Sequence, residues 1–303
     1  MSMSLRALSL VLCLIVLPAP AAFAQGFSTS IATPYRVVPN ITYLTANNYE
    51  AKLDVYSRTD VTTPQPTLIW IHGGGWIGGN KESATFSLLP YLEMGWNVVN
   101  VEYRMARVSL APAAVEDCLC ALRWVIRNAK QYGFDTAKLV VSGGSAGGHL
   151  ALTTAMTPAS TGLDRQCPGT EELKVAAAVD WYGITDVADL LEGPNIKTYA
   201  VQWLGSLPNR IEVAKRVSPL TYVRSGQPPV ISIHGDADPT VPYNHSVRLR
   251  EALTKVGVDV ELVTIPGGKH GGFSRAENQK AYGSIRAFLA KHGLIATTSS
   301  TQD

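Results

Sequence analysis

The sequence predicts an α/β fold, in which a mostly parallel, twisted sheet carries helices on both of its faces. Strand-like and helix-like segments alternate along most of the 303 residues, and this alternation is typical of parallel sheets with helical crossovers. Several strand-like segments are apolar at successive positions, for example "TLIWI" from Thr67 and "LVV" from Leu139. Strands without a polar face indicate a sheet that is covered on both sides.

The elements follow one another in a regular order. Strands are expected in the segments "KLDVYSR" near residue 52, "TLIWIHGG" from Thr67, "NVVNVEYR" from Asn97, "KLVVSG" from Lys138, "VAAAVDWYG" from Val175, "PPVISIHGD" from Pro228 and "VDVELVTIPGG" from Val258. A helix is predicted over about residues 113–132, because its apolar residues recur at helical spacing. Further helices are expected from Ala146 and over about residues 275–292.

One long stretch, residues 186–222, departs from this pattern. It contains short helix-like pieces that are interrupted by prolines and glycines. We interpret it as a small cap inserted between two core strands; the alternative is an ordinary long connection. The folded domain is expected over residues 25–294, and the tail at residues 295–303, rich in Ser and Thr, is expected to be disordered.

The first 24 residues have the pattern of a secretory signal peptide. Arg6 precedes an apolar core from Leu8 to Leu17, and Ala22-Phe23-Ala24 is an A-x-A cleavage pattern. The alternative is a membrane anchor, but the apolar core is short for a span and two prolines follow it. We therefore expect cleavage after Ala24, no stable membrane insertion afterwards, and a mature protein that is secreted or periplasmic.

The cysteines are consistent with two different states. Cys13 leaves with the signal peptide, which leaves Cys118, Cys120 and Cys167. In an oxidising compartment, Cys167 can pair with either Cys118 or Cys120, with one buried thiol left over. The other interpretation is three unpaired thiols that pack as small apolar groups. No His or second cysteine pair lies near the C-x-C spacing, so no metal site is predicted.

Composition and charge exclude few functions. They give no indication of a function that requires a strongly charged surface. The chain is 46% hydrophobic and 17% charged, with a net charge of +2, which is ordinary for a globular protein. No long run of like charge is present, so no nucleic-acid partner is predicted. The sequence does not indicate the oligomeric state.

One serine lies among residues with almost no side chain, in "SGGSAGG" at residues 142–148. Ser145 occupies the centre of a G-x-S-x-G pattern. A nucleophile between a strand end and a helix start needs a sharp, strained turn, and the turn needs small neighbours. It exposes the hydroxyl and points the first helical N–H groups at the atom that is attacked. The alternatives are a glycine-rich phosphate turn, for which no accompanying motif is found, and a tight turn with an idle serine.

A serine hydroxyl needs a base, and the base needs a group that orients it. His270 lies in "PGGKHGGF", after the last strand, where a loop can reach the ligand site of an open α/β sheet. The acid is expected between Ser145 and His270 in the chain. "HGDADPTVPY" offers Asp236 and Asp238; Asp238 lies further into the loop and is expected to face the histidine, whereas Asp236 is expected to shape the turn.

A second glycine-rich segment, "HGGGWIGG" at residues 72–79, follows another strand. Glycines at such a position can expose backbone N–H groups to a substrate oxygen. We expect the N–H groups of Gly74, Gly75 and Ala146 to form an oxyanion hole, with Trp76 as an alternative donor in place of one glycine. A flexible turn without a function is the alternative.

Together these segments resemble an α/β-hydrolase esterase, close to the hormone-sensitive-lipase-like esterases and to the small feruloyl and acetyl esterases that deacylate plant polysaccharides. The resemblance covers about residues 67–275, in the family's order, through "WIHGGGWIGGNK", "NVVNVEYRM", "AAVEDCLCALRWV", "SGGSAGGHLA", "HGDADPTVPY" and "GGKHGGF". It implies a Ser-Asp-His triad, which maps onto Ser145, Asp238 and His270. "EYRMARVSLAP" departs from the longer, proline-rich version of the lipase-like branch, so that branch's acyl preference is not transferred.

The expected function is hydrolysis of carboxylic esters through an acyl-enzyme, without a metal or organic cofactor. The expected substrates are small-molecule esters with short or aromatic acyl groups, or acylated saccharides. Five aromatic residues are predicted to line the substrate pocket, with core packing as the alternative: Trp76, Trp181, Tyr182, Tyr199 and Trp203.

Two other functions fit parts of the sequence. A serine peptidase of the prolyl-oligopeptidase type shares the triad order, but it usually carries a large propeller domain, and the roughly 42 mature residues before Thr67 leave no room for one. A non-catalytic binding protein on the same fold usually lacks a triad member, and all three members are present here.

Overall fold

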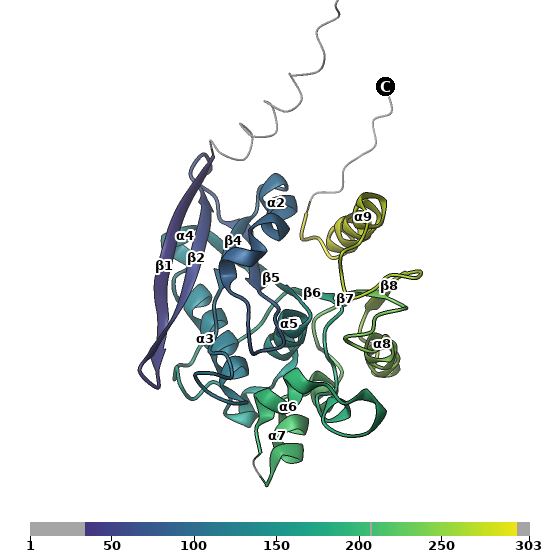
Figure 1. The fold of residues 1–303 in the computed structure, drawn as a ribbon. Coiled ribbons are helices and arrows are strands. Elements are labelled where there is room, and N and C mark those ends of the chain that lie inside the picture. The colour runs from purple at the N-terminus through teal and green to yellow at the C-terminus, as the bar shows by residue number, and fades with distance from the viewer. Residues whose placement is uncertain (1–33, 207, 296–303) are drawn as a thin grey trace, which may run out of the picture.

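The computed structural model describes residues 34–206 and 208–295. The predicted signal peptide lies outside these residues, as does the predicted tail apart from Ile295. In the described part, one eight-stranded sheet crosses the molecule in the order β1-β2-β4-β3-β5-β6-β7-β8 (Figure 1). The strands are β1 (Tyr35–Ala46), β2 (Tyr49–Arg58), β3 (Gln65–Ile71), β4 (Asn97–Val101), β5 (Phe134–Gly144), β6 (Ala177–Trp181), β7 (Val230–Gly235) and β8 (Val260–Ile265).

The direction of the strands brings the predicted loops to one edge. β1 pairs with β2, and β2 with β4, in antiparallel fashion, whereas every pair from β4 to β8 is parallel. The loops that follow β3, β5, β6, β7 and β8 therefore all leave the same edge of the sheet, at the carboxyl ends of the strands.

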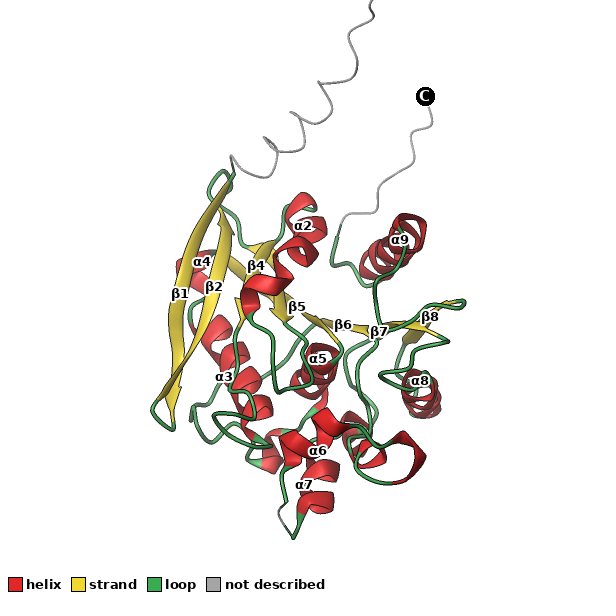
Figure 2. Ribbon diagram, viewed as in Figure 1, coloured by secondary structure: helices red, strands yellow, loops and turns green. Residues whose placement is uncertain are grey.

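Helices cover both faces of this sheet, as Figure 2 shows. Leu88 of α2 (Thr85–Glu93) and Phe288 of α9 (Arg275–Lys291) belong to the apolar core on one face. The core on the other face includes buried residues of α3 (Ala113–Arg127), α5 (Ala146–Met156) and α8 (Asn244–Lys255). The predicted fold class is confirmed. No helix within the described ranges is long and apolar enough to cross a membrane.

The structure divides two segments into shorter elements: the helix predicted over residues 113–132 and the predicted cap at residues 186–222. The helix predicted over residues 113–132 is divided at Asn128 into α3 and α4 (Ala129–Tyr132), and the Asn128 side chain donates to the Trp124 carbonyl. The stretch 186–222 lies between β6 and β7. It forms η3 (Ala188–Leu190), η4 (Gly193–Asn195), α6 (Thr198–Leu204), α7 (Arg210–Arg216) and η5 (Pro219–Tyr222). The remaining short helices are η1 (Lys81–Ala84) and η2 (Ala159–Thr161).

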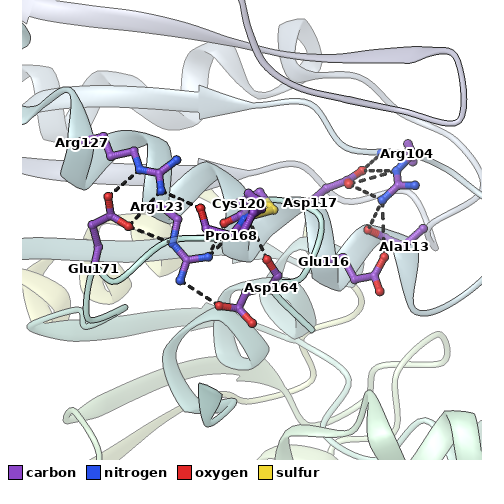
Figure 3. The surroundings of a disulfide bond; sticks show 11 residues. Arg104, Ala113, Glu116, Asp117, Cys120, Arg123, Arg127, Asp164, Pro168 and Glu171 are labelled. Atoms are coloured by element: carbon purple, nitrogen blue, oxygen red, sulfur yellow. Dashed lines mark hydrogen bonds and ion pairs between the residues drawn. A yellow bond between two sulfur atoms is a disulfide. The ribbon is translucent and has the colours of Figure 1, made fainter. Parts of the chain in front are cut away.

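A disulfide connects α3 to the loop that follows α5 (Figure 3). Cys120 is bonded to Cys167, and Cys118 is a buried free thiol, which is one of the pairings left open by the sequence. Arg123 reinforces the connection by donating to Asp164 at 2.8 Å. One turn further along α3, Arg127 donates to the Pro168 carbonyl at 2.8 Å. Covalent and polar contacts thus fix the same loop to one helix.

Removal of the disulfide should lower the stability of the fold. The two cysteines are 47 residues apart, and closing a loop of this size restricts the unfolded chain by about 4 kcal/mol in the chain-entropy treatment. We expect the variant Cys120→Ala/Cys167→Ala to lose about 2–4 kcal/mol of unfolding free energy in urea. Cys118→Ala, which keeps the disulfide, is the control: a reductant should destabilise it and the wild type, and leave the double variant unchanged. Equal sensitivity of all three to the reductant would contradict the assignment.

Candidate active site

The serine turn is the junction between β5 and α5. β5 ends at Gly144 and α5 begins at Ala146, so Ser145 alone makes the change of direction. Its backbone has φ 59° and ψ −121°, a conformation that a non-glycine residue adopts only under strain. The Ser145 N–H donates to the carbonyl of Trp181 at the end of β6, at 2.8 Å. The hydroxyl is thereby held at the carboxyl edge of the sheet.

Two glycines of the turn are required by the close passage of β3. A Cβ atom at Gly143 would lie 2.4 Å from the Ile71 carbonyl oxygen, and one at Gly147 would lie 2.1 Å from the same atom. Both distances are far below van der Waals contact. The strand before the turn and the helix after it therefore pack directly on β3, and only residues without a side chain allow this.

The three residues of the predicted triad lie together. His270 Nε2 is 2.8 Å from Ser145 Oγ, and His270 Nδ1 is 2.7 Å from Asp238 Oδ2. The three residues come from the loops that follow β5, β7 and β8, which leave the sheet at one edge. The Asp238 side chain is fully buried, whereas 21% of the His270 side chain is exposed. The imidazole therefore lies between a buried carboxylate and an accessible hydroxyl.

Asp238 is held in its ionised form by several donors. Its Oδ1 accepts from the backbone N–H groups of Thr240 and Val241, at 2.7 and 3.0 Å. Burial raises the pKa of Asp238, but the hydrogen bonds from His234, His270 and the Val241 N–H outweigh burial and hold the pKa well below its ordinary value. A carboxylate that stays charged in this position accepts from His270 Nδ1–H and orients the ring.

A second histidine contacts the same carboxylate and was not singled out by the sequence. His234 ends β7, is fully buried, and places Nε2 3.2 Å from Asp238 Oδ2 and 3.1 Å from the Val241 carbonyl. Because a carbonyl only accepts, Nε2 carries a proton and donates. Nδ1 lies 2.7 Å from Ser246 Oγ in α8. His234 therefore connects the carboxylate to the helix that covers β7.

The glycine-rich loop after β3 lies beside the serine. Gly74 and Gly75 have positive φ values of 117° and 61°, and the Gly74 carbonyl accepts from the N–H groups of Ile77 and Gly78, which closes a tight turn. In the part of the chain that the structure describes, the N–H groups of Gly74 and Gly75 are not used in backbone turn hydrogen bonds. Ala146 is the first residue of α5, so its N–H has no acceptor within the helix. Gly74 and Gly75 line the same cavity as Ser145, so the arrangement is compatible with the predicted oxyanion hole.

A cavity of about 470 Å³, which we call the serine cavity, opens over the triad. Its lining includes Ser145, His270, Gly73, Gly74, Gly75, Tyr182, Tyr199 and Thr240. Tyr199 comes from α6 of the stretch 186–222 and donates its hydroxyl hydrogen to the Thr240 carbonyl at 3.1 Å. Two of the five predicted aromatic residues, Tyr182 and Tyr199, therefore face this cavity, and Trp181 lines a neighbouring one.

The prediction of substrate contact is wrong for the side chains of Trp76 and Trp203. Both are fully buried, and their rings stack with centroids 4.1 Å apart. Trp76 Nε1 donates to His149 Nδ1 at 3.2 Å, which satisfies its polar atom inside the core. These two side chains fix α6 against the glycine-rich loop and α5, and they have no surface left for a ligand.

A buried carboxyl supports the serine turn from below. Asp180 of β6 is fully buried and accepts from the Gly183 N–H at 2.9 Å and from the Ser232 hydroxyl at 2.8 Å. A Cβ atom at Gly148 would lie 2.5 Å from its Oδ1, so the carboxyl packs against the first turn of α5. Burial, only partly opposed by the Ser232 hydrogen bond, raises the pKa of Asp180 to about 6.

The raised pKa of Asp180 predicts a stability that depends on pH. In the unfolded chain the carboxyl loses its proton near its ordinary pKa, about two units below the value of about 6 in the fold. Stability should therefore fall as pH rises from about 4 to 7, by roughly 3 kcal/mol. Asp180→Asn cannot titrate and so lacks this loss. In urea titrations, the unfolding free energy of the variant minus that of the wild type should therefore increase as pH rises across that range. A difference that stays constant from pH 4 to pH 8 would show that Asp180 is not protonated in the fold.

Alanine substitutions at two helical glycines, one packed tightly at the turn and one in open space, should have opposite effects on stability. Gly147→Ala places a methyl group against the Ile71 carbonyl, and overpacking of this kind costs about 2–3 kcal/mol. Gly283 lies in the middle of α9 with no atom within 4 Å of the added methyl group, so Gly283→Ala should gain about 0.5–1 kcal/mol from helix propensity. Thermal and urea unfolding of both variants test the prediction; a neutral Gly147→Ala would show that β3 does not restrain the turn.

Comparison with known proteins identifies the family. The BD-FAE family model matches residues 53–253. Esterase LipQ of Mycobacterium tuberculosis is 31% identical over 233 residues, which cover 73% of this chain and 54% of LipQ. The chain thus spans little more than half the length of this curated relative.

Solved structures match over most of their length. The thermophilic esterase Est2 of Thermogutta terrifontis, in its native form, superposes with a TM-score of 0.70 and 30% identity, covering 88% of this chain and 95% of that one. A truncated carbohydrate esterase from gut microbiota gives a TM-score of 0.73 and 27% identity, with 86% and 97% covered. The chain therefore belongs to the BD-FAE family and has the α/β-hydrolase fold of esterases.

Proposed function

We propose that this protein is a serine hydrolase of carboxylic esters, which works through an acyl-enzyme at Ser145. The observation that carries the proposal is the continuous hydrogen-bonded chain from Ser145 through His270 to Asp238, at 2.8 and 2.7 Å, on the wall of an open cavity. The relatives are named esterases, which favours ester hydrolysis over a peptidase or a non-catalytic binding protein.

The first half of the reaction forms the acyl-enzyme. His270 Nε2 accepts the Ser145 proton while Oγ bonds to the ester carbonyl carbon, and the carbonyl electron pair moves to the oxygen. Asp238 stabilises the resulting imidazolium because it stays ionised in its set of donors. The N–H groups of Gly74, Gly75 and Ala146 stabilise the oxyanion, and losing one such donor typically costs about 10²–10³ in rate.

The second half of the reaction releases the acid. The oxyanion collapses, the bond to the leaving oxygen breaks, and His270 gives that oxygen its proton. With the alcohol gone, water takes its place beside His270, which removes a proton as the water attacks the acyl carbon. Collapse of the second intermediate frees Ser145 with its proton restored, and the residues named here supply every proton transfer.

The substrates we propose have short or aromatic acyl groups. The Thermogutta esterase has also been solved with propionate bound and with butyrate bound, and the second structural relative is named a carbohydrate esterase. In this chain, Tyr182 and Tyr199 give the serine cavity aromatic walls. Acetyl and feruloyl esters of plant saccharides combine these features, so we propose them as a natural class.

We further propose that the protein acts outside the cytoplasm, secreted or in a periplasm. The signal-peptide pattern before Gln25 supports this location. The bond between Cys120 and Cys167 supports it independently, because structural disulfides persist mainly in oxidising compartments.

The serine mechanism predicts a specific loss of activity. Ser145→Ala should lower kcat/KM for p-nitrophenyl acetate by at least about 10³-fold, and paraoxon should label the wild type, but not this variant, at residue 145. Ser225→Ala, which changes an exposed serine far along the chain, is the control and should hydrolyse and label as the wild type does.

Aminoacyl anilides complete the same experiment. Hydrolysis of these amides at a rate comparable to that of p-nitrophenyl acetate would favour the peptidase instead. A wild type that hydrolyses no ester and is not labelled at Ser145 would favour a binding protein. Turnover that survives in Ser145→Ala would end the proposal of an acyl-enzyme at this residue.

A further inference from the structure

A second, smaller cavity adjoins the serine cavity. It has a volume of about 160 Å³, and we call it the aromatic cavity because of the rings in its wall. The two cavities share four wall residues: Trp70, Ser87, Gly144 and Tyr182. Neither Ser145 nor His270 lines the aromatic cavity. A side chain that faces both spaces therefore separates the reacting groups from additional room.

Tyr182 has a strained backbone and is fixed in place by packing. Its φ is 43°, in the left-handed region that an aromatic residue adopts only at a cost. Its N–H donates to the Ile233 carbonyl at 2.8 Å. Its ring meets the His270 ring edge-on, with centroids 4.7 Å apart, and the Phe273 ring at 5.9 Å. Such strain persists only where the surrounding structure fixes the residue, and it is concentrated at functional sites.

Two glycines of the active site make room for the phenol group. A Cβ atom at Gly144 would lie 3.3 Å from Tyr182 Oη, and one at Gly271 would lie 2.9 Å from it. Gly144 directly precedes Ser145, and Gly271 directly follows His270. The phenol end of Tyr182 therefore lies next to the backbone of both the serine turn and the histidine loop, where it closes the space between them.

The Tyr182 hydroxyl lacks a protein partner among the residues that the structure describes, although the ring is mostly enclosed. Burial raises its pKa to about 12, so the group remains a neutral hydroxyl at physiological pH. A hydroxyl that bonded firmly to the protein would indicate a purely structural tyrosine. Here the ring is fixed and the hydroxyl is free, as suits a wall that contacts ligand.

The chemistry of the aromatic cavity fits a bulky apolar group. Its wall includes Trp181, Phe273 and Tyr282 in addition to Trp70. Trp70 and Trp181 are 6% and 5% exposed. Their indole N–H groups are buried and have no acceptor among the described residues. The rings in this wall suit an aliphatic or aryl group.

We propose that Tyr182 determines substrate size: its phenol ring is a partition that keeps small esters in the serine cavity and excludes larger groups from the aromatic cavity. The inference rests on the proposed function of the site, which it makes more specific. Shortening the side chain would join about 160 Å³ to the space over Ser145, whereas removing the hydroxyl alone would leave the partition in place.

The test compares Tyr182→Gly with Tyr182→Phe. Glycine accepts the positive φ without strain, and phenylalanine keeps the ring. Two ester series are measured by pH-stat: p-nitrophenyl acetate, butyrate and octanoate vary the acyl group, and methyl, butyl and benzyl acetate vary the alcohol. In Tyr182→Gly, the ratio of kcat/KM for the largest to the smallest ester should rise about tenfold or more in one series. That series identifies the half of the ester that Tyr182 limits. In Tyr182→Phe both ratios should stay within about twofold of the wild type.

Further measurements separate the possible failures. Tyr182→Ala serves as a second opening variant if Tyr182→Gly does not fold, and thermal unfolding reports folding in each case. Unchanged ratios in both series, in a folded opening variant that hydrolyses p-nitrophenyl acetate, would overturn the partition and leave the proposed function intact. An equal rise in Tyr182→Phe would also overturn it, because the ring would still be present. A wild type that turns over no ester and is not labelled by paraoxon at Ser145 would instead overturn the proposed function.

Discussion

The active site depends on one packing constraint, the contact of β3 with both sides of the serine turn. The Ile71 carbonyl lies where side chains at Gly143 and Gly147 would be, so the chain can pass from β5 to α5 within a single residue. That residue must adopt a strained conformation, and its hydroxyl must leave the sheet. Because Gly143 near the end of β5 and Gly147 in the first turn of α5 both pack against β3, the strain cannot relax by moving either element.

Electrostatics then decide what the raised hydroxyl can do. The two buried carboxyls near the turn have opposite surroundings. Asp238 receives hydrogen bonds from two histidines and from backbone N–H groups and stays ionised. Asp180 has one hydroxyl and one N–H as donors, and its pKa rises to about 6. Burial outweighs the hydrogen bonds at Asp180, whereas the hydrogen bonds outweigh burial at Asp238. The same residue type thus serves as a fixed negative charge beside His270 and as a mostly uncharged support beneath α5 at mildly acid pH.

The sequence allowed the prediction of the parallel core and of the residues that meet at the site, because apolar strands and glycine-rich loops are local signals. Other features depend on contacts between distant segments. β1 has largely exposed residues along its first half, so it lacks an apolar pattern. His234 contacts Asp238 only once β7 and its loop are folded. Cys118 and Cys120 lie about 200° apart around a helix, so only the packed structure shows that Cys120 faces Cys167.

The aromatic residues show most clearly why composition does not define a pocket. Trp76 and Trp203 stack on each other in the core, while Trp181 and Tyr182, adjacent in the chain, divide their roles. The Trp181 carbonyl accepts from the Ser145 N–H and thereby holds the nucleophile. Its neighbour Tyr182 turns through a positive φ to face the cavities. The end of β6 therefore supports the reacting serine and shapes the space for its substrate. A substitution at Trp181 or Tyr182 can consequently affect both the position of Ser145 and the shape of the cavity.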